Sequence, residues 1–202
     1  MLAGSSEGVN EGYFRPLEVV TRRGSLFHAE APAPCFLYAW PAMQAMEVIY
    51  RAIAKVHPEA VPASSGGDIS GVMLYGLNPA TGEPWATGTP LPCGQGGHAR
   101  GDGATLMHVA ESATRIPPVE VSEARYPLLF ERLELQPDSG GSGKYRGGLA
   151  LRVEMRCMQD SRAITVLEHT KSAPWGAAGG SEGESNSAVY MEIGRASCRE
   201  RV

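Results

Sequence analysis

Residues 120–155 read EVSEARYPLLFERLELQPDSGGSGKYRGGLALRVEM, and this stretch decides the fold because it contains two strand-like runs joined by a glycine-rich connection. In the second run, residues 148–156, apolar and polar side chains alternate with a period of two, as in a strand with one buried face. The first run, residues 128–135, ends before Pro137, which has no N–H for a ladder hydrogen bond. The period predicts that four alternate side chains of the second run are buried: Leu149, Leu151, Val153 and Met155.

The connection Asp138–Gly148 is too long for a tight turn and too rich in glycine for a helix. Spacing excludes a phosphate-binding P-loop, because Asp138 stands where that motif needs a glycine and Tyr145 stands where it needs Ser or Thr. The tetrad Asp-Ser-Gly-Gly at 138–141 is shared with trypsin-like proteases, but the upstream His and Asp of that fold have no counterpart here. In the structural interpretation, five glycines take positive φ or permit close approach of two chain segments: Gly140, Gly141, Gly143, Gly147 and Gly148.

Composition indicates a loop-rich globular protein and argues against nucleic-acid binding. The 202 residues include 25 glycines and 15 prolines, with 18 basic and 22 acidic residues, so the formal net charge is −4. No run approaches the roughly 20 apolar residues of a membrane span, and the N-terminus does not resemble a signal peptide. We expect a cytoplasmic protein with no membrane association and a substantial core. Four isolated cysteines argue against zinc or disulfides and for buried free thiols: Cys35, Cys93, Cys157 and Cys198.

The remaining patterns predict an α+β fold, with mostly antiparallel strands, one amphipathic helix and long Gly-rich loops. The helix begins at Pro41 and ends near His57, because apolar residues recur at helical spacing and form a core-facing stripe. Glu47 and Arg51 stand at the spacing of an ion pair on that helix. The stripe comprises Ala42, Ala45, Met46, Ile49, Ala52, Ile53 and Val56. Further elements are expected at Arg15–Val20, Ile69–Leu77 and Ala163–Glu168 as strands, and at Asn78–Gly82 as a hairpin-like turn.

The loop Gly94–Gly103 contains the candidate site residues. Its glycines would let the backbone approach a ligand, with His98, Arg100 and Asp102 as polar tips; the alternative is a surface loop with a solvated histidine. A metal site built from His98, Asp102 and His108 is a further alternative, but flexible glycine offers no preset geometry. Spacing thus assigns no metal ligand and no cofactor site.

Several motifs, in this order along the chain, resemble the signature of the hydantoinase B family. The B-type subunits of ATP-dependent 5-oxoprolinases and N-methylhydantoinases form this family, together with related acetone carboxylases. The motifs are Asn10–Pro16, Gly24-Ser25, Pro62–Gly67, Asp102-Gly103, Pro118–Glu120, Tyr126–Leu128, Glu131-Arg132, Leu135–Leu149 and Pro174–Gly180. The resemblance implies that Asp138–Gly148 is an ordered, shaped element and not a linker.

The resemblance also implies an activity, ATP-dependent opening of a cyclic amide such as 5-oxoproline or a hydantoin, with ketone carboxylation as a sister reaction. It implies that a hydantoinase A-type subunit uses ATP to phosphorylate the substrate, and that the B-type part acts beside a divalent metal. It places the metal ligands in an N-terminal half absent from this chain, so none is assigned to its residues. Gln95 and His98 depart from the family's Trp-containing loop, which leaves the substrate open.

Two further expectations concern the extent of the domain. Residues 1–191 are expected to be the C-terminal part of a hydantoinase B-like subunit, inactive and metal-free by itself. Residues 192–202 (EIGRASCRERV) resemble the translation of a sequencing adapter, so we expect a foreign tail that packs on nothing. The rival hypothesis is a non-catalytic scaffold segment that docks partner subunits. A glycine-lined cleft with convergent polar groups favours the enzyme, and a broad apolar patch favours the scaffold.

Overall fold

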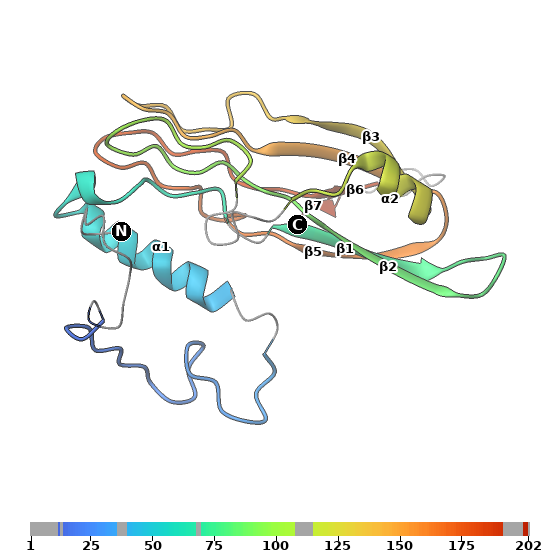
Figure 1. The fold of residues 1–202 in the computed structure, drawn as a ribbon, viewed down its shortest axis with the longest axis horizontal. Coiled ribbons are helices and arrows are strands. Elements are labelled where there is room, and N and C mark those ends of the chain that lie inside the picture. Colours follow the sequence, from blue (N-terminus) through green and yellow to red (C-terminus); the bar gives the residue numbers. More distant parts are fainter. Residues whose placement is uncertain are drawn as a thin grey trace.

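The computed structural model describes residues 12, 14–35, 40–67, 70–107, 115–191 and 200–201. It shows an α+β fold with antiparallel sheets, as predicted (Figure 1). The elements are α1 (Trp40–Ala54), the 3-10 helix η2 (Pro58–Ala60), β1 (Gly71–Leu77), β2 (Pro84–Pro90), α2 (Val119–Arg125), β3 (Leu128–Leu135), β4 (Leu151–Cys157), β5 (Ser161–Val166), β6 (Val189–Tyr190) and β7 (Glu200–Arg201). They form three sheets with the orders β2-β1-β5, β3-β4 and β6-β7.

The three-stranded sheet is built on the hairpin of β1 and β2. Its turn is closed by two hydrogen bonds, from Gly82 N to Asn78 O (2.7 Å) and from Asn78 N to Glu83 O (2.8 Å). This confirms the hairpin-like turn, and Gly82 has the positive φ of 71° that such a turn favours. Strand β5 adds to the other edge of β1, beginning two residues before the predicted Ala163.

Strands β3 and β4 pair antiparallel, with a register shift between Phe130 and Arg132. β3 has its predicted bounds, but β4 begins at Leu151 and not at Gly148. The predicted alternation of burial is only partly present. The four apolar side chains from Leu149 to Met155 are half-buried where full burial was expected, because the two-stranded ribbon is thinly covered. On the opposite face, Arg152 and Arg156 are exposed, whereas Ala150 and Glu154 are half-buried.

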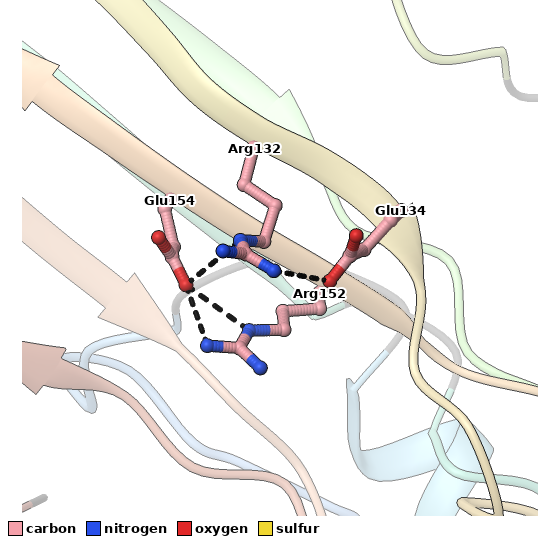
Figure 2. Close-up of polar contacts among 4 residues, drawn as sticks. All are labelled: Arg132, Glu134, Arg152 and Glu154. Carbon is pink, nitrogen blue, oxygen red and sulfur yellow. Dashed lines mark hydrogen bonds and ion pairs between the residues drawn. The ribbon is translucent and has the colours of Figure 1, made fainter.

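The polar face of this ribbon carries an ion network of four residues (Figure 2). Glu154 Oε1 accepts from Arg152 Nη2 at 2.6 Å and lies 3.2 Å from Arg132 Nε, while Arg132 Nη1 donates to Glu134 Oε1 at 2.8 Å. The hydrogen bond from Arg152 lowers the pKa of Glu154, and the hydrogen bond to Glu134 raises the pKa of Arg132. The network is solvent-exposed, so it fixes cross-strand register more than it stabilises the fold.

The ion network gives a titration prediction. Because the folded pKa of Glu154 is lowered, its contribution to stability is present above the unfolded pKa and is lost as pH falls through the folded pKa. Replacing Arg152→Met should raise the pKa of Glu154 toward its ordinary value, as followed by carboxyl NMR. Arg156→Met is the matched control, because Arg156 pairs with Glu131 instead. An equal effect of both substitutions would contradict the assignment.

Helix α1 forms where the apolar spacing predicts it, but its stripe is not core. Val48 and Ile49 are 68% and 55% exposed, and Met43, outside the predicted stripe, is the buried residue of the helix. Instead of pairing with Arg51, the Glu47 carboxylate accepts hydrogen bonds from Ser64 and Ser65. The predicted helix is thus confirmed, whereas the predicted role of its stripe and the ion pair are wrong.

The core is smaller than the chain length allows. Buried hydrophobic side chains among the described residues are Met43, Val61, Leu74, Cys93, Leu128 and Val166. Of the cysteines, Cys93 is a buried thiol as predicted, but Cys35 and Cys157 are exposed. Helix α2 was not predicted, because a seven-residue helix after Pro118 is too short to show a period.

Both ends of the chain differ from expectation. The predicted strand Arg15–Val20 is irregular, with Leu17 and Val20 exposed, although the turn Arg22–Ser25 is present with a 3.2 Å backbone bond. Residues 192–199 and 202 lie outside the described part of the chain. The pairing of β6 with β7 brings Glu200 and Arg201 against Tyr190 and Val189, so the expectation that the tail packs on nothing is wrong there. No helix in the described ranges is long and apolar enough to span a bilayer.

Candidate functional site

Four irregular segments lie side by side at one end of the molecule (Figure 1). We call them the glycine stack: residues 61–67, 91–104, 138–150 and 174–186. Backbone hydrogen bonds join each segment to another, for example Ala63 N to Gly97 O (2.9 Å), Gly148 N to Gln95 O (2.8 Å) and Ser64 N to Trp175 O (3.0 Å). The stack therefore satisfies its backbone polar groups without being a sheet.

The loop Asp138–Gly148 is an ordered part of this stack, as predicted. It is closed by a hydrogen bond from Gly147 N to Gly141 O (2.9 Å). It is tied to the last segment by Glu184 N to Ser139 O (2.9 Å). The buried Ser139 hydroxyl also donates to Gln136 O and accepts from Ala150 N, each at 2.8 Å.

Glycine is required in the stack because backbones touch. A Cβ on Gly94 would lie 1.9 Å from Gly148 O, and a Cβ on Gly148 would lie 2.0 Å from Ala104 O. The corresponding distance for Gly140 to Gly147 O is 2.2 Å. The described glycines with positive φ are elsewhere, so of the two structural explanations close approach is right and positive φ is wrong for this loop. The pattern of glycines is explained by packing before any ligand is considered.

The stack nevertheless encloses a cleft of about 410 Å³. Backbone of the glycine segments forms much of its lining, and Ser64, Ser139 and Asn186 contribute partly or wholly buried polar groups. Exposed His98 and Lys144 also line the cleft. This volume falls in the range of about 300–1,000 Å³ that suits a small-molecule ligand.

The three predicted site residues take different positions. His98 lines the cleft, and its Nδ1 accepts from Arg100 N at 3.2 Å, so the neutral ring carries its proton on Nε2. Asp102 does not line the cleft; its carboxylate accepts from Arg146 N (3.0 Å) and lies 3.6 Å from Arg146 Nε. Arg100 is exposed and also lies outside the cleft lining. The loop thus places one candidate at the cleft and uses a second to anchor residues 138–148.

Sequence reasoning missed the polar contacts that join the stack to the rest of the fold. Asn186 Nδ2 donates to Gly66 O (2.5 Å) and to Glu168 O (2.8 Å). Glu47 of α1 accepts from the Ser64 hydroxyl at 2.7 Å, and Gln44 Nε2 donates to Glu168 Oε1 at 3.0 Å. These pairs are separated by 17 to 124 residues, so no local pattern could reveal them.

The donor set of the described residues does not fit a divalent metal. Within the described ranges, no three His, Cys, Asp or Glu side chains converge in a way that could hold an ion. Glu47 and Glu168 are held by hydroxyl and amide donors instead. His108, the third member of the alternative metal set, lies outside the described residues.

Comparison with known proteins identifies the class. The family model described as hydantoinase B/oxoprolinase matches residues 1–201, and the chain belongs to that family. This confirms the resemblance drawn from the motifs. A relative, the putative B-type subunit of a D-/L-hydantoinase from Pseudomonas sp. (strain NS671), is 28% identical over 175 residues, which is 86% of this chain and 29% of that protein.

Two solved structures share the fold. The ATP-dependent caprolactamase of Pseudomonas jessenii matches with a TM-score of 0.76 and 24% identity, over all of this chain and 36% of the other. The nucleotide-free acetone carboxylase matches with a TM-score of 0.56 and 23% identity, over 69% of this chain and 19% of the other. This chain therefore spans about a third or less of the length of these proteins.

Proposed function

We propose that this chain is the C-terminal part of the B-type subunit of an ATP-dependent enzyme that opens a cyclic amide, such as 5-oxoproline or a hydantoin. The family match over residues 1–201 is the observation that carries the proposal. The names of two relatives, a D-/L-hydantoinase and an ATP-dependent caprolactamase, support it. A cytoplasmic enzyme, with access to ATP, is the corresponding location.

In this proposal an A-type partner subunit handles ATP, and the divalent metal is held by the N-terminal half of the B-type subunit. The donor set of the described residues supports that division, because it offers no ligand group for the ion. The chain purified alone is then inactive and free of stoichiometric metal. Its own contribution is to shape the cleft and to supply polar groups there.

Of the predicted site residues, we assign His98 to the substrate and Asp102 to positioning. Neutral His98 has a proton on Nε2 because Nδ1 accepts from Arg100 N, so the ring can donate to the carbonyl oxygen of a cyclic amide. Asp102 holds the backbone of Arg146 and thereby the loop that forms the opposite wall. Arg100 has no assigned role.

The assay uses the natural reading frame that contains this chain, purified with its A-type partner. We expect 5-oxoproline, a hydantoin or a lactam to be opened with release of ADP and phosphate, followed by mass spectrometry of the product. His98→Ala should lower kcat/KM by about 10²-fold if the ring donates in the transition state. Arg100→Ala is the matched control and should change it less than about twofold, because a surface side chain outside the cleft contributes little.

Three outcomes contradict the proposal. Carboxylation of a ketone with bicarbonate and no ring opening would assign the chain to the carboxylase branch, to which the acetone carboxylase fold belongs. Ring opening by residues 1–191 alone would place the whole active site in this chain. Equal losses for His98→Ala and Arg100→Ala would remove His98 from the substrate site.

A further inference from the structure

A second, larger depression lies on the other side of α1. It is bounded by α1, by residues 24–35 and by residues 165–172, and we call it the arm groove. Its volume is about 1,440 Å³. Sites for small molecules are usually about 300–1,000 Å³, so the arm groove is better matched to a polypeptide segment.

The walls of the arm groove are apolar and uncovered. Val48 of α1 and Leu26 of the opposite wall line it and are 68% and 74% exposed. Ile49 and Val56 add exposed apolar surface on the same helix region. An amphipathic helix of a folded protein normally buries such a stripe, so the exposed stripe marks a surface that another element covers.

The polar groups at the groove are already engaged within the chain. Glu47 accepts from Ser64 and Ser65, and Glu168 accepts from Gln44. Glu30 pairs with Arg23. An occupant therefore needs apolar side chains and not a complementary charge, which favours an apolar polypeptide segment over a charged metabolite.

We infer that the arm groove is the seat of a segment from the rest of the B-type subunit. The caprolactamase chain that contains this whole fold is nearly three times as long, since the match covers 36% of it. A covalently continuous segment has a high effective concentration and covers an apolar groove at little entropic cost. The inference rests on the proposed assembly with the remainder of a B-type subunit, but not on the reaction.

Two native cysteines allow a direct test. Cys35 is exposed and lines the arm groove, whereas Cys157 is exposed at the end of β4. The probe is the part of the Pseudomonas jessenii caprolactamase chain outside the match, supplied as a separate polypeptide. We expect it to slow maleimide labelling of Cys35 at least tenfold, by peptide mass spectrometry, and to leave Cys157 unchanged.

Val48→Asp should abolish this protection without lowering Tm, because Val48 is exposed in the chain alone. Leu77→Asp is the control, since Leu77 of β1 is 62% exposed and outside the groove lining, and it should keep the protection. Unchanged labelling of Cys35, or equal protection of Cys157, would overturn the inference. So would protection by a second copy of this chain, or by the A-type subunit alone.

This test is independent of the assay for activity. Protection of Cys35 without ring opening in the assembled enzyme would retain the arm groove and reject the proposed reaction. Ring opening without protection of Cys35 would do the reverse.

Discussion

Replacing Gly94 by alanine is expected to prevent stable folding of residues 1–191, or to lower the free energy of unfolding by about 3 kcal/mol or more. The new Cβ would lie 1.9 Å from the carbonyl oxygen of Gly148 and 2.3 Å from its carbonyl carbon. A side-chain clash relaxes by a change of rotamer, but both of these atoms belong to the backbone. Relief therefore requires two segments of the glycine stack to separate, with loss of the hydrogen bond from Gly148 N to Gln95 O.

The matched control is Gly88→Ala in β2. There the nearest atom to a new Cβ is Met73 Cγ at 3.8 Å, an ordinary contact. Loss of backbone entropy in the unfolded chain should then make this substitution neutral or stabilising by up to about 1 kcal/mol. Urea unfolding followed by circular dichroism measures both variants. Similar stabilities for Gly94→Ala and Gly88→Ala would show that the stack is not packed backbone to backbone.

Patterns with a local cause were predictable from the sequence. β3 has its predicted bounds because Pro137 ends the run, and the turn at Asn78–Gly82 is present because residue types of that kind favour turns. The loop Asp138–Gly148 is ordered as the family resemblance implied. Helix α1 is also where its period places it.

The outcome differs where burial depends on distant chain. The stripe of α1 has the period of a core-facing helix, but the side chains that cover it are not among the described residues, so Val48 and Ile49 are exposed. For the same reason the apolar face of β4 is only half-buried. Period reports that a face needs a partner and does not report which element provides it.

The candidate site was predictable in location but not in roles. The glycines and polar tips of Gly94–Gly103 pointed to this loop, and His98 does line a cleft. The role of Asp102 depends on Arg146, 44 residues away, and that contact has no local signature. Both features chosen to separate an enzyme part from a docking scaffold are present, on opposite sides of α1: the cleft and the exposed apolar groove. One segment can therefore shape a site and dock the rest of its subunit.

Asn186→Asp is the second substitution with a large expected effect. The Asn186 amide donates to Gly66 O at 2.5 Å and to Glu168 O at 2.8 Å, and thereby joins the first and last segments of the stack to the end of β5. An aspartate of the same shape has no donor when ionised, and its carboxylate would face two carbonyl oxygens. Two partly buried acceptors lose their partners, at about 1–3 kcal/mol each. We expect a loss of about 3 kcal/mol or more at pH 7.

The pH dependence of this loss has a definite sign. The two carbonyl oxygens disfavour the charged form, so the pKa of the new carboxyl group is raised in the folded state. A protonated acid can donate one hydrogen bond, so the loss relative to wild type should be smaller at pH 4 than at pH 7. Asn78→Asp is the matched control, because the Asn78 side chain accepts from Ala80 N at 2.9 Å and a carboxylate keeps that bond. Urea unfolding at both pH values should show a large, pH-dependent loss at position 186 and almost none at 78, and equal losses would refute the tie made by Asn186.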